Sequence, residues 1–366
     1  MKRINVLIID DSAFMRKLIA DFLSQDPRLN VVGTARNGED GLRKIKELNP
    51  DVVTMDVEMP VLNGLAALKI IMKSRPVPVV MLSSTTKEGA DNTFAAMEYG
   101  AVDFIAKPSG TLSLDLHKIK AELAEKVVSA SKANITNLGI ISSLGKNRKE
   151  IERNYSKIEL NKSIDQSIGA AIKSSTHDKR IICIGTSTGG PRALQKVLTK
   201  LPGDLNAPVL IVQHMPAGFT KSLASRLNGL SELTVKEAEK GDILEKGTAY
   251  IAPGGFHLKV GSSGRDLVLQ LDQSPPKNGH RPSVDIMFQS VSELMGFRKI
   301  AVIMTGMGAD GREGLAAIKK SGDVIAIAES KETSIVFGMP RAAIEAGLID
   351  DVQNVDRIAE SILKYV

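Results

Sequence analysis

Short apolar runs alternate with amphipathic segments over the first third of the chain. The runs predict strands buried on both faces of a parallel sheet, and they cover residues 4–9, 31–35, 52–55, 79–82 and 103–105. Helical spacing over residues 15–25 and 38–48 separates the first three runs, and Asn49 and Pro50 close the second of these segments. Five βα units of this kind predict an α/β domain with a parallel sheet and helices on both faces.

The same pattern resumes at about residue 179. It predicts buried strands over residues 181–185, 209–213, 300–304 and 324–328, with helices over 191–199, 311–320 and 355–365. A glycine-rich middle predicts a β-hairpin of residues 258–260 and 267–270, turned by Ser262, Ser263 and Gly264. We therefore expect a second α/β domain, doubly wound and mostly parallel, with a β-hairpin.

The stretch between these domains has a different composition. Of the 50 residues from 129 to 178, 16 are Ser, Asn or Thr, and none is Pro, Phe or Trp. We expect a first domain over residues 1–125, a linker over 126–178 and a second domain over 179–366. Half of the net charge of +6 falls in the same stretch, so the charge does not indicate a nucleic-acid surface on a folded domain.

The number of cysteines and the lengths of the apolar runs indicate in which compartment the protein is found. A single cysteine, Cys183, excludes a disulfide framework and a Cys-based zinc site, and it fits a reducing compartment. Asp10 and Asp11 stop the first apolar run, and no run approaches the ~18 apolar residues of a membrane span. We expect a cytoplasmic protein without direct membrane insertion.

Charged and hydroxyl side chains follow the predicted strands of the first domain. Asp10 and Asp11 end the first strand, Asp56 the third, Ser83 the fourth and Lys107 the fifth. Since the carboxyl ends of parallel strands meet at one edge of the sheet, these side chains should gather there. Three carboxylates favour a hard cation such as Mg²⁺, and a lysine with a hydroxyl suits the oxygens of a phosphoryl group on Asp56. Singly, Asp11 could instead cap the next helix and Lys107 could be solvated.

With these residues in this order, the first third resembles the receiver domain of two-component response regulators. The resemblance implies a flavodoxin-like five-stranded parallel sheet, phosphorylation of Asp56 and a histidine kinase as phosphodonor. It implies Mg²⁺ for the phosphorylation, held by Asp11, Asp56 and the carbonyl of Glu58, with Asp10 helping through water.

The resemblance also assigns the phosphoryl oxygens to Ser83 and Lys107. The adjacent Ser84 leaves the choice of hydroxyl open by one position. Phe104 stands where the family carries a switch aromatic. A receiver domain regulates something else, so the second domain should carry the output.

The second domain opens with a candidate nucleophile. Residues 181–191 predict a strand, a glycine-rich turn and a helix start, with Ser187 exposed at the end of the strand. The backbone N–H groups that follow Ser187 would be free to bind an oxyanion. The same glycines could alternatively cradle a phosphate.

Two further strand ends complete a possible triad. His214 follows the strand at residues 209–213, and Asp310 lies in a glycine-rich loop after residues 300–304. A neutral serine hydroxyl needs an imidazole as base and a carboxylate to orient that imidazole. Taken singly, His214 could be a packed histidine and Asp310 a cap on the helix from Gly311.

Chain order separates this arrangement from commoner folds. An α/β-hydrolase runs Ser, Asp, His, whereas this chain runs Ser, His, Asp. A Rossmann dinucleotide site would need an acid after the second strand, where this chain has Gln213 and His214.

The whole chain resembles the chemotaxis response-regulator family of protein-glutamate methylesterases. Five motifs carry the resemblance in the second domain: residues 185–190 (GTSTGG), 213–216 (QHMP), 280–285 (HRPSVD), 304–308 (MTGMG) and 337–341 (FGMPR). It implies phosphorylation-activated hydrolysis of glutamate γ-methyl esters on the cytoplasmic part of methyl-accepting chemoreceptors, and deamidation of receptor glutamines. Ser187 would be the nucleophile, His214 the base and then the acid, and Asp310 the orienting group, with the N–H groups of Thr188 and Met307 as oxyanion donors.

The family arrangement also implies that the receiver covers the cleft, and that hydrolysis needs no cofactor. His280 and Arg281 form a Pro-flanked basic pair that could meet an acidic receptor helix or could be structural. A DNA-binding output would require a helix-turn-helix and clustered positive charge, which a Gly-rich α/β domain does not offer. A receiver-controlled nucleotide-binding output is the second alternative.

Overall fold

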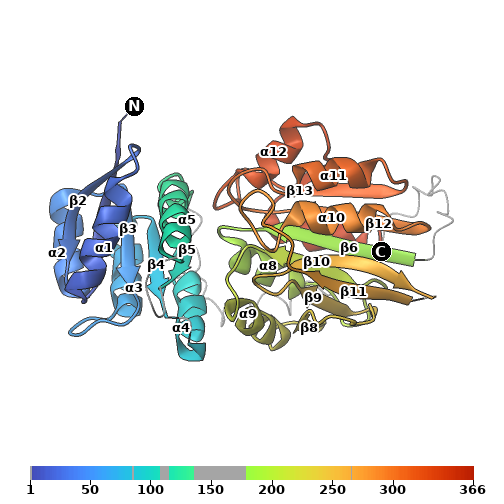
Figure 1. The fold of residues 1–366 in the computed structure, drawn as a ribbon, viewed down its shortest axis with the longest axis horizontal. Helices are drawn as coiled ribbons and strands as arrows, with labels where there is room; N and C mark the ends of the chain where they lie inside the picture. The colour runs from blue at the N-terminus through green and yellow to red at the C-terminus, as the bar shows by residue number, and fades with distance from the viewer. Residues whose placement is uncertain (1, 85, 108–114, 136–178, 265) are drawn as a thin grey trace, which may run out of the picture.

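A computed structural model describes residues 2–84, 86–107, 115–135, 179–264 and 266–366 of the chain. They form two α/β domains that lie side by side along the long axis of the molecule (Figure 1). The predicted two-domain α/β architecture is therefore confirmed.

The first domain is built on a parallel sheet. Within the described residues it has five strands in the order β2-β1-β3-β4-β5, which is the flavodoxin-like order. The strands are β1 (Ile4–Ile9), β2 (Leu29–Ala35), β3 (Val52–Asp56), β4 (Val79–Ser83) and β5 (Asp103–Ala106). Because the winding reverses between β1 and β3, a crevice for ligands opens outside the carboxyl ends of these two strands.

Helices cover both faces of this sheet, which is why its strands are apolar without alternation. One face packs on α1 (Ala13–Ser24) and α5 (Asp115–Ala130), the other on α2 (Gly38–Leu48), α3 (Gly64–Ser74) and α4 (Lys87–Glu98). The bounds of α2 match the prediction, because Asn37 caps its start and Asn49 ends it in a left-handed conformation, with φ 46°. Helix α5 continues past residue 125, and residues 136–178 of the expected linker lie outside the described residues, so the domain boundaries stay predictions.

The second domain has a larger parallel sheet. Its order in the described chain is β14-β13-β12-β6-β7-β9-β8, and every neighbouring pair is parallel. The strands are β6 (Lys179–Thr186), β7 (Val209–Gln213), β8 (Thr234–Glu237), β9 (Thr248–Ile251), β12 (Phe297–Ile303), β13 (Val324–Glu329) and β14 (Asp351–Gln353). The winding reverses beside β6, so the ends of β6, β7 and β12 meet at one edge.

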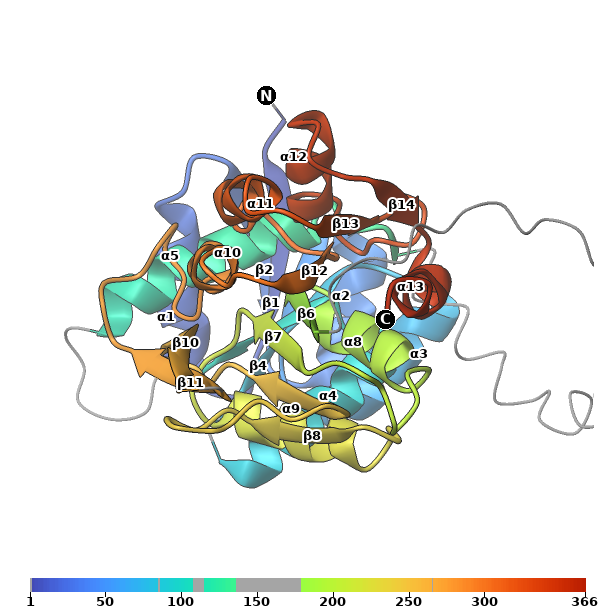
Figure 2. The same ribbon diagram turned by 90° about the vertical axis from the view of Figure 1, so that its right-hand side faces the viewer.

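This sheet is also covered on both faces (Figure 2). Helices α8 (Gly190–Leu198), α9 (Phe219–Asn228) and α13 (Val355–Leu363) pack on one face, and α10 (Val284–Ser292), α11 (Arg312–Lys319) and α12 (Met339–Glu345) on the other. The predicted hairpin is present as β10 (His257–Ser263) and β11 (Asp266–Asp272). Its predicted turn was wrong in part: Ser262 and Ser263 pair with β11, so the ladder runs on to Gly264, whose φ is +64°.

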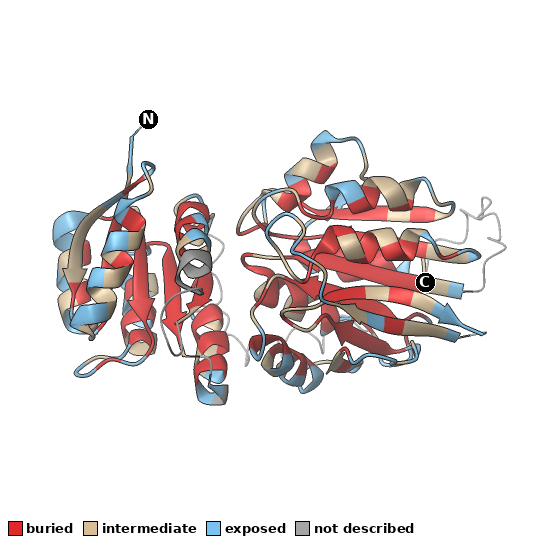
Figure 3. Cartoon of the chain, in the orientation of Figure 1, coloured by how far each residue is buried: buried red, intermediate tan, exposed pale blue. Residues whose placement is uncertain are grey.

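Apolar side chains join the two domains. Phe94, Met97 and Phe104 of the first domain belong to one buried cluster with Phe219 and Leu223 of the second. Phe94 and Met97 of α4 are accordingly buried, and Figure 3 shows buried, intermediate and exposed stretches on this helix, which faces the second domain. No helix among the described residues has the length and apolar character needed to cross a bilayer.

Candidate functional site

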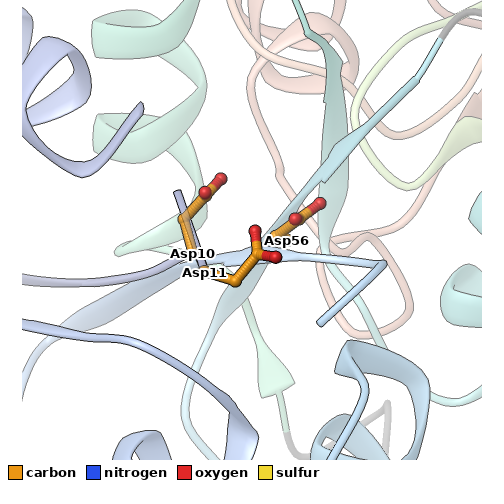
Figure 4. Close-up of side chains that lie close together, drawn as sticks. All are labelled: Asp10, Asp11 and Asp56. Atoms are coloured by element: carbon orange, nitrogen blue, oxygen red, sulfur yellow. The ribbon is translucent and has the colours of Figure 1, made fainter. Parts of the chain in front are cut away.

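The three predicted carboxylates lie together at the crevice of the first domain (Figure 4). One carboxylate oxygen each of Asp10, Asp11 and Asp56 falls within a group 4.8 Å across. Asp10 and Asp56 are buried, whereas Asp11 is exposed and lines an open depression of about 500 Å³ together with Glu58. Several oxygen donors around a buried negative charge fit a hard cation such as Mg²⁺.

Lys107 belongs to the same cluster. Its Nζ lies 2.7 Å from Asp56 Oδ2 and 3.2 Å from Asp10 Oδ2. Burial raises the pKa of Asp56 to about 6, against the opposing effect of Lys107. Burial would lower the pKa of Lys107, but Asp56 and Asp10 hold it above its usual value. A lysine held between two carboxylates is not the solvated side chain of the alternative interpretation.

The capping alternative for Asp11 also finds no support. The cap of α1 is Ser12, whose Oγ accepts from the N–H of Met15 at 3.3 Å, and Asp10 Oδ1 accepts from the N–H of Ser12 at 2.9 Å. The Asp11 carboxylate is therefore not used to cap the helix.

Ser83 and Ser84 differ in their surroundings. Ser83 ends β4, is buried, and donates from Oγ to the Gly89 carbonyl at 2.9 Å. The N–H of Lys107 donates to the Ser83 carbonyl at 2.7 Å, which ties the two strand ends together. Ser84 Oγ is instead 3.0 Å from Thr86 Oγ1.

In the second domain, Ser187 follows β6 in the predicted strand–turn–helix. Its N–H donates to the Thr305 carbonyl at 3.0 Å, and Gln213 Nε2 donates to the Ser187 carbonyl at 3.0 Å. Gly189, with φ +79°, makes the turn into α8. A Cβ at Gly306 would lie 2.8 Å from the Ser187 Cβ, so glycine is needed for the loop after β12 to approach the serine.

His214 and Asp310 are in direct contact. His214 Nε2 lies 2.8 Å from Asp310 Oδ2, and the His214 N–H donates to the Thr186 carbonyl at 3.2 Å, next to Ser187. His214 Nδ1 is buried and has no hydrogen-bond partner among the described residues. No hydrogen bond joins His214 to the Ser187 hydroxyl in the described structure, but Nδ1 is the ring nitrogen left to make one.

Asp310 caps a helix, though not the expected one. Helix α11 begins at Arg312, after Gly311 and without a side-chain cap. Asp310 instead accepts from the N–H groups of Val284 (2.7 Å) and Asp285 (3.2 Å) at the start of α10. Burial alone would raise the pKa of Asp310, but hydrogen bonds from His214 and Val284 and the proximity of His214 hold it well below its usual value. Capping α10 and contacting His214 are therefore simultaneous, not alternative, roles.

Sequence reasoning missed the side chains that support this carboxylate. Ser283 Oγ and Asn278 Nδ2 donate to Asp310 Oδ1 at 2.8 and 3.2 Å. Asn278 also donates to Asp285, which in turn accepts from the Gly314 N–H of α11 at 2.7 Å. Burial raises the pKa of Asp285. Ser283 and Asp285 lie in the 280–285 motif, which signals their importance without assigning their partners.

His280 stacks on His214, with ring centroids 3.8 Å apart and an interplanar angle of 11°. Burial and the neighbouring His214 lower the pKa of His280 to about 3, so its ring is neutral at physiological pH. Arg281 donates from one nitrogen to the carbonyls of Gln273 (2.8 Å) and Ser274 (3.0 Å). The pair is thus engaged within the site and its adjoining loop, and it does not form a free basic patch.

The two expected oxyanion donors belong to segments that adjoin the serine. Thr188 follows Ser187, and Met307 follows Gly306 in the loop packed against it. Neither backbone N–H has a hydrogen-bond acceptor among the described residues. Thr188 Oγ1 donates to Asp103 Oδ2 of the first domain at 2.5 Å, so the receiver-like domain reaches the edge of this site.

Comparison with known proteins agrees with the two-domain structure. The CheB methylesterase family model matches residues 182–362, and the response regulator receiver domain model matches residues 6–117. These matches support a methylesterase output and do not support the alternative of a DNA-binding or nucleotide-binding output.

Two curated relatives and one solved structure extend the match. The protein-glutamate methylesterase/protein-glutamine glutaminase of Geobacillus kaustophilus is 57% identical over 366 residues, covering 100% of this chain and 99% of the relative. That of Bacillus subtilis is 49% identical and covers 99% of this chain and 98% of the relative. The crystal structure of the Thermotoga maritima CheB methylesterase catalytic domain, 47% identical with a TM-score of 0.50, covers 51% of this chain and 99% of that one. The chain therefore belongs to the family of protein-glutamate methylesterases/protein-glutamine glutaminases, in which a CheB methylesterase domain follows a response regulator receiver domain.

Proposed function

We propose that the enzyme hydrolyses glutamate γ-methyl esters, and deamidates glutamines, on the cytoplasmic domains of methyl-accepting chemoreceptors. The observation that carries the proposal is the His214–Asp310 pair beside Ser187, at the ends of three neighbouring strands of a domain that matches CheB methylesterases. The names of the relatives support the same two activities.

In the proposed reaction, Ser187 Oγ attacks the ester carbonyl carbon while its proton passes to His214 Nδ1. The Nε2–H of His214 donates to Asp310, which holds the ring in the required tautomer and stabilises the imidazolium that forms. The two ring nitrogens are used in the opposite sense from the serine proteases, where Nδ1 faces the aspartate. This assignment follows because His214 Nε2 contacts Asp310 Oδ2, whereas His214 Nδ1 has no hydrogen-bond partner among the described residues.

The tetrahedral intermediate carries a negative oxygen. The unpaired N–H groups of Thr188 and Met307, with the start of α8 directly after the serine, suit that oxygen. When the intermediate collapses, the C–O bond breaks and methanol leaves with the proton from His214. Water then attacks the acyl-enzyme, His214 takes a water proton and returns it to Ser187, and the glutamate is released. From a glutamine, ammonia leaves in place of methanol.

We further propose that Asp56 is phosphorylated by a histidine kinase. Asp10, Asp11, Asp56 and the Glu58 carbonyl would hold Mg²⁺, which screens the negative charge on the phosphoryl group and the carboxylates. Ser83, buried at the end of β4, and Lys107, already paired with Asp56, would contact the phosphoryl oxygens. The hydrolytic steps use only side chains and backbone of the second domain.

The contact between the domains suggests how phosphorylation controls hydrolysis. Phe104, the expected switch aromatic, packs on Phe219 with ring centroids 4.7 Å apart, and Asp103 next to it binds Thr188 beside the nucleophile. We infer that in this closed packing the receiver covers the approach to Ser187. Phosphorylation of Asp56 would shift the population away from it. We place the enzyme in the cytoplasm, together with the chemoreceptor domains and the histidine kinase, and expect no nucleic-acid partner.

Methanol release from methylated receptor membranes, with and without a small-molecule phosphodonor, tests the proposal. Ser187→Ala in the full chain should lose roughly 10⁴- to 10⁶-fold in turnover, since the covalent step has no other nucleophile. Asp56→Asn should keep the low basal rate whatever phosphodonor is added. If Ser187→Ala kept a tenth of wild-type turnover, Ser187 would not be the nucleophile.

A further inference from the structure

Helix α4 of the receiver contacts α8 and α9 of the catalytic domain, which it faces in Figure 1. We call the contacted side of these two helices the α8–α9 surface; it consists of Pro191, Arg192, Gln195, Leu223, Arg226 and Leu227. Phe94, Met97 and Glu98 of α4 face it across a narrow gap. A helix of the same chain thus shows which kind of partner the surface can hold.

The residues that α4 presents have a defined pattern. Phe94, Met97 and Glu98 are spaced i, i+3 and i+4, which places them on one face of the helix. Phe94 and Met97 are buried, and the Glu98 carboxylate pairs with Arg226. The α8–α9 surface therefore accepts an amphipathic helix with an apolar stripe flanked by an acidic residue.

Arg192 is not satisfied by this partner. Both terminal guanidinium nitrogens are shielded from solvent, and neither has a hydrogen-bond partner among the described residues. Burial lowers the pKa of Arg192, and no carboxylate in the described part of the chain offsets it. A buried cation without a counter-charge is costly. Helix α4 thus brings one carboxylate to a surface with two arginines, which fits a more acidic helix better.

The α8–α9 surface also adjoins the segments that carry Ser187 and His214. Arg192 lies in the first turn of α8, which follows Ser187 through a short turn, and α9 begins at Phe219, shortly after His214. A helix lying on α8 and α9 would bring its side chains to the nucleophile.

We propose that the α8–α9 surface binds the substrate helix, through apolar contacts and through carboxylates of that helix that pair with both Arg192 and Arg226. In the closed state α4, which is less acidic, occupies the same surface. This inference rests on the proposed function, because it takes the substrate to be a glutamate-bearing helix. Charge-assisted hydrogen bonds between these arginines and the carboxylates of the substrate helix would provide the recognition. Release of α4 then uncovers the catalytic serine and the docking surface together.

The test uses the full chain, activated with a small-molecule phosphodonor, and initial rates of methanol release over a range of methylated receptor membrane concentrations. Arg192→Gln and Arg226→Gln should each raise KM about tenfold, the factor expected for the loss of one charge-assisted contact, and leave kcat within about twofold. Lys221→Gln is the matched control, because it removes an exposed positive charge from α9 outside the surface, and its KM should equal that of the wild type.

A receiver-side variant separates docking from closure. Glu98→Gln removes the partner of Arg226 in the closed state, so it should raise the rate without phosphodonor and leave the KM of the activated enzyme unchanged. If the arginine variants raised only the rate without phosphodonor, with a KM equal to that of Lys221→Gln, the surface would serve the receiver alone and the inference would be wrong. A wild-type enzyme that releases no methanol would instead refute the proposed function itself.

Discussion

Replacing Asp310 by asparagine probes the proposed triad at its most connected residue. Oδ2 accepts from His214 Nε2 at 2.8 Å and from the Val284 N–H at 2.7 Å. Oδ1 accepts from Ser283 Oγ at 2.8 Å and more weakly from Asn278 and Asp285 at 3.2 Å. Since every partner donates, the NH₂ group of the introduced amide would face donors in either orientation.

The two orientations have different costs. With NH₂ toward His214, Nε2 must accept, its proton moves to Nδ1, and the ring can no longer take the proton of Ser187. In serine proteases the equivalent change costs about 10⁴-fold in kcat. With NH₂ on the other side, the ring keeps its tautomer but loses the negative charge that stabilises the imidazolium. In both cases α10 loses part of its cap, which is worth roughly 1–2 kcal/mol.

We therefore expect Asp310→Asn to lower kcat by roughly 10³- to 10⁴-fold and to reduce the free energy of unfolding only modestly. Methanol release by the phosphodonor-activated enzyme and urea denaturation measure the two effects. Asp285→Asn is the matched control: Asp285 shares Asn278 and caps α11 through Gly314 but does not contact His214. It should lose stability and keep kcat within about tenfold. A kcat above a tenth of wild type in Asp310→Asn would leave Asp310 with the capping role alone.

Three further outcomes are expected. Asp103→Ala removes a buried bond from Thr188 to a carboxylate, worth ~1.5–3 kcal/mol, so methanol release without phosphodonor should rise about tenfold or more; an unchanged rate would show that this bond does not hold the closed state. Chelating divalent cations should block phosphorylation of Asp56, followed with a radiolabelled phosphodonor, and spare the basal hydrolysis rate; a basal rate that falls with it would place a metal in the hydrolytic step. Burial raises the pKa of Glu329 to about 7, above its unfolded value, so the free energy of unfolding of the wild type relative to Glu329→Gln should fall by up to about 3 kcal/mol as pH rises from 4.5 to above 7. Urea denaturation at each pH measures this difference, and a difference that stays constant would contradict the effect of burial on this carboxyl group.

The apolar pattern predicts the five strands of the first sheet and the strands β6, β7, β12 and β13 of the second, together with the strand ends that carry the candidate chemistry, but it misses β8, β9 and β14. Strands covered on both faces are apolar throughout, so their runs and the polar residues that end them are local features. The apolar pattern predicts the first strand at residues 4–9 and β7 at residues 209–213, as the structure has them. Since parallel strands bring their carboxyl ends to one edge, the gathering of Asp10, Asp11 and Asp56, and of Ser187 and His214, followed from their positions alone.

The use of these side chains depends on tertiary contacts. Asp310 was a candidate cap for the helix that follows it, but it caps α10, because the start of α10 packs beside the end of β12. Which nitrogen of His214 faces Asp310, and the stacking of His280 on the other side, depend on rotamers that packing selects. The placement of α4 on Arg192 and Arg226 joins distant segments, with 128 residues between Glu98 and Arg226. Such contacts are set by how whole domains pack, for which hydrophobic periodicity within one segment carries no signal.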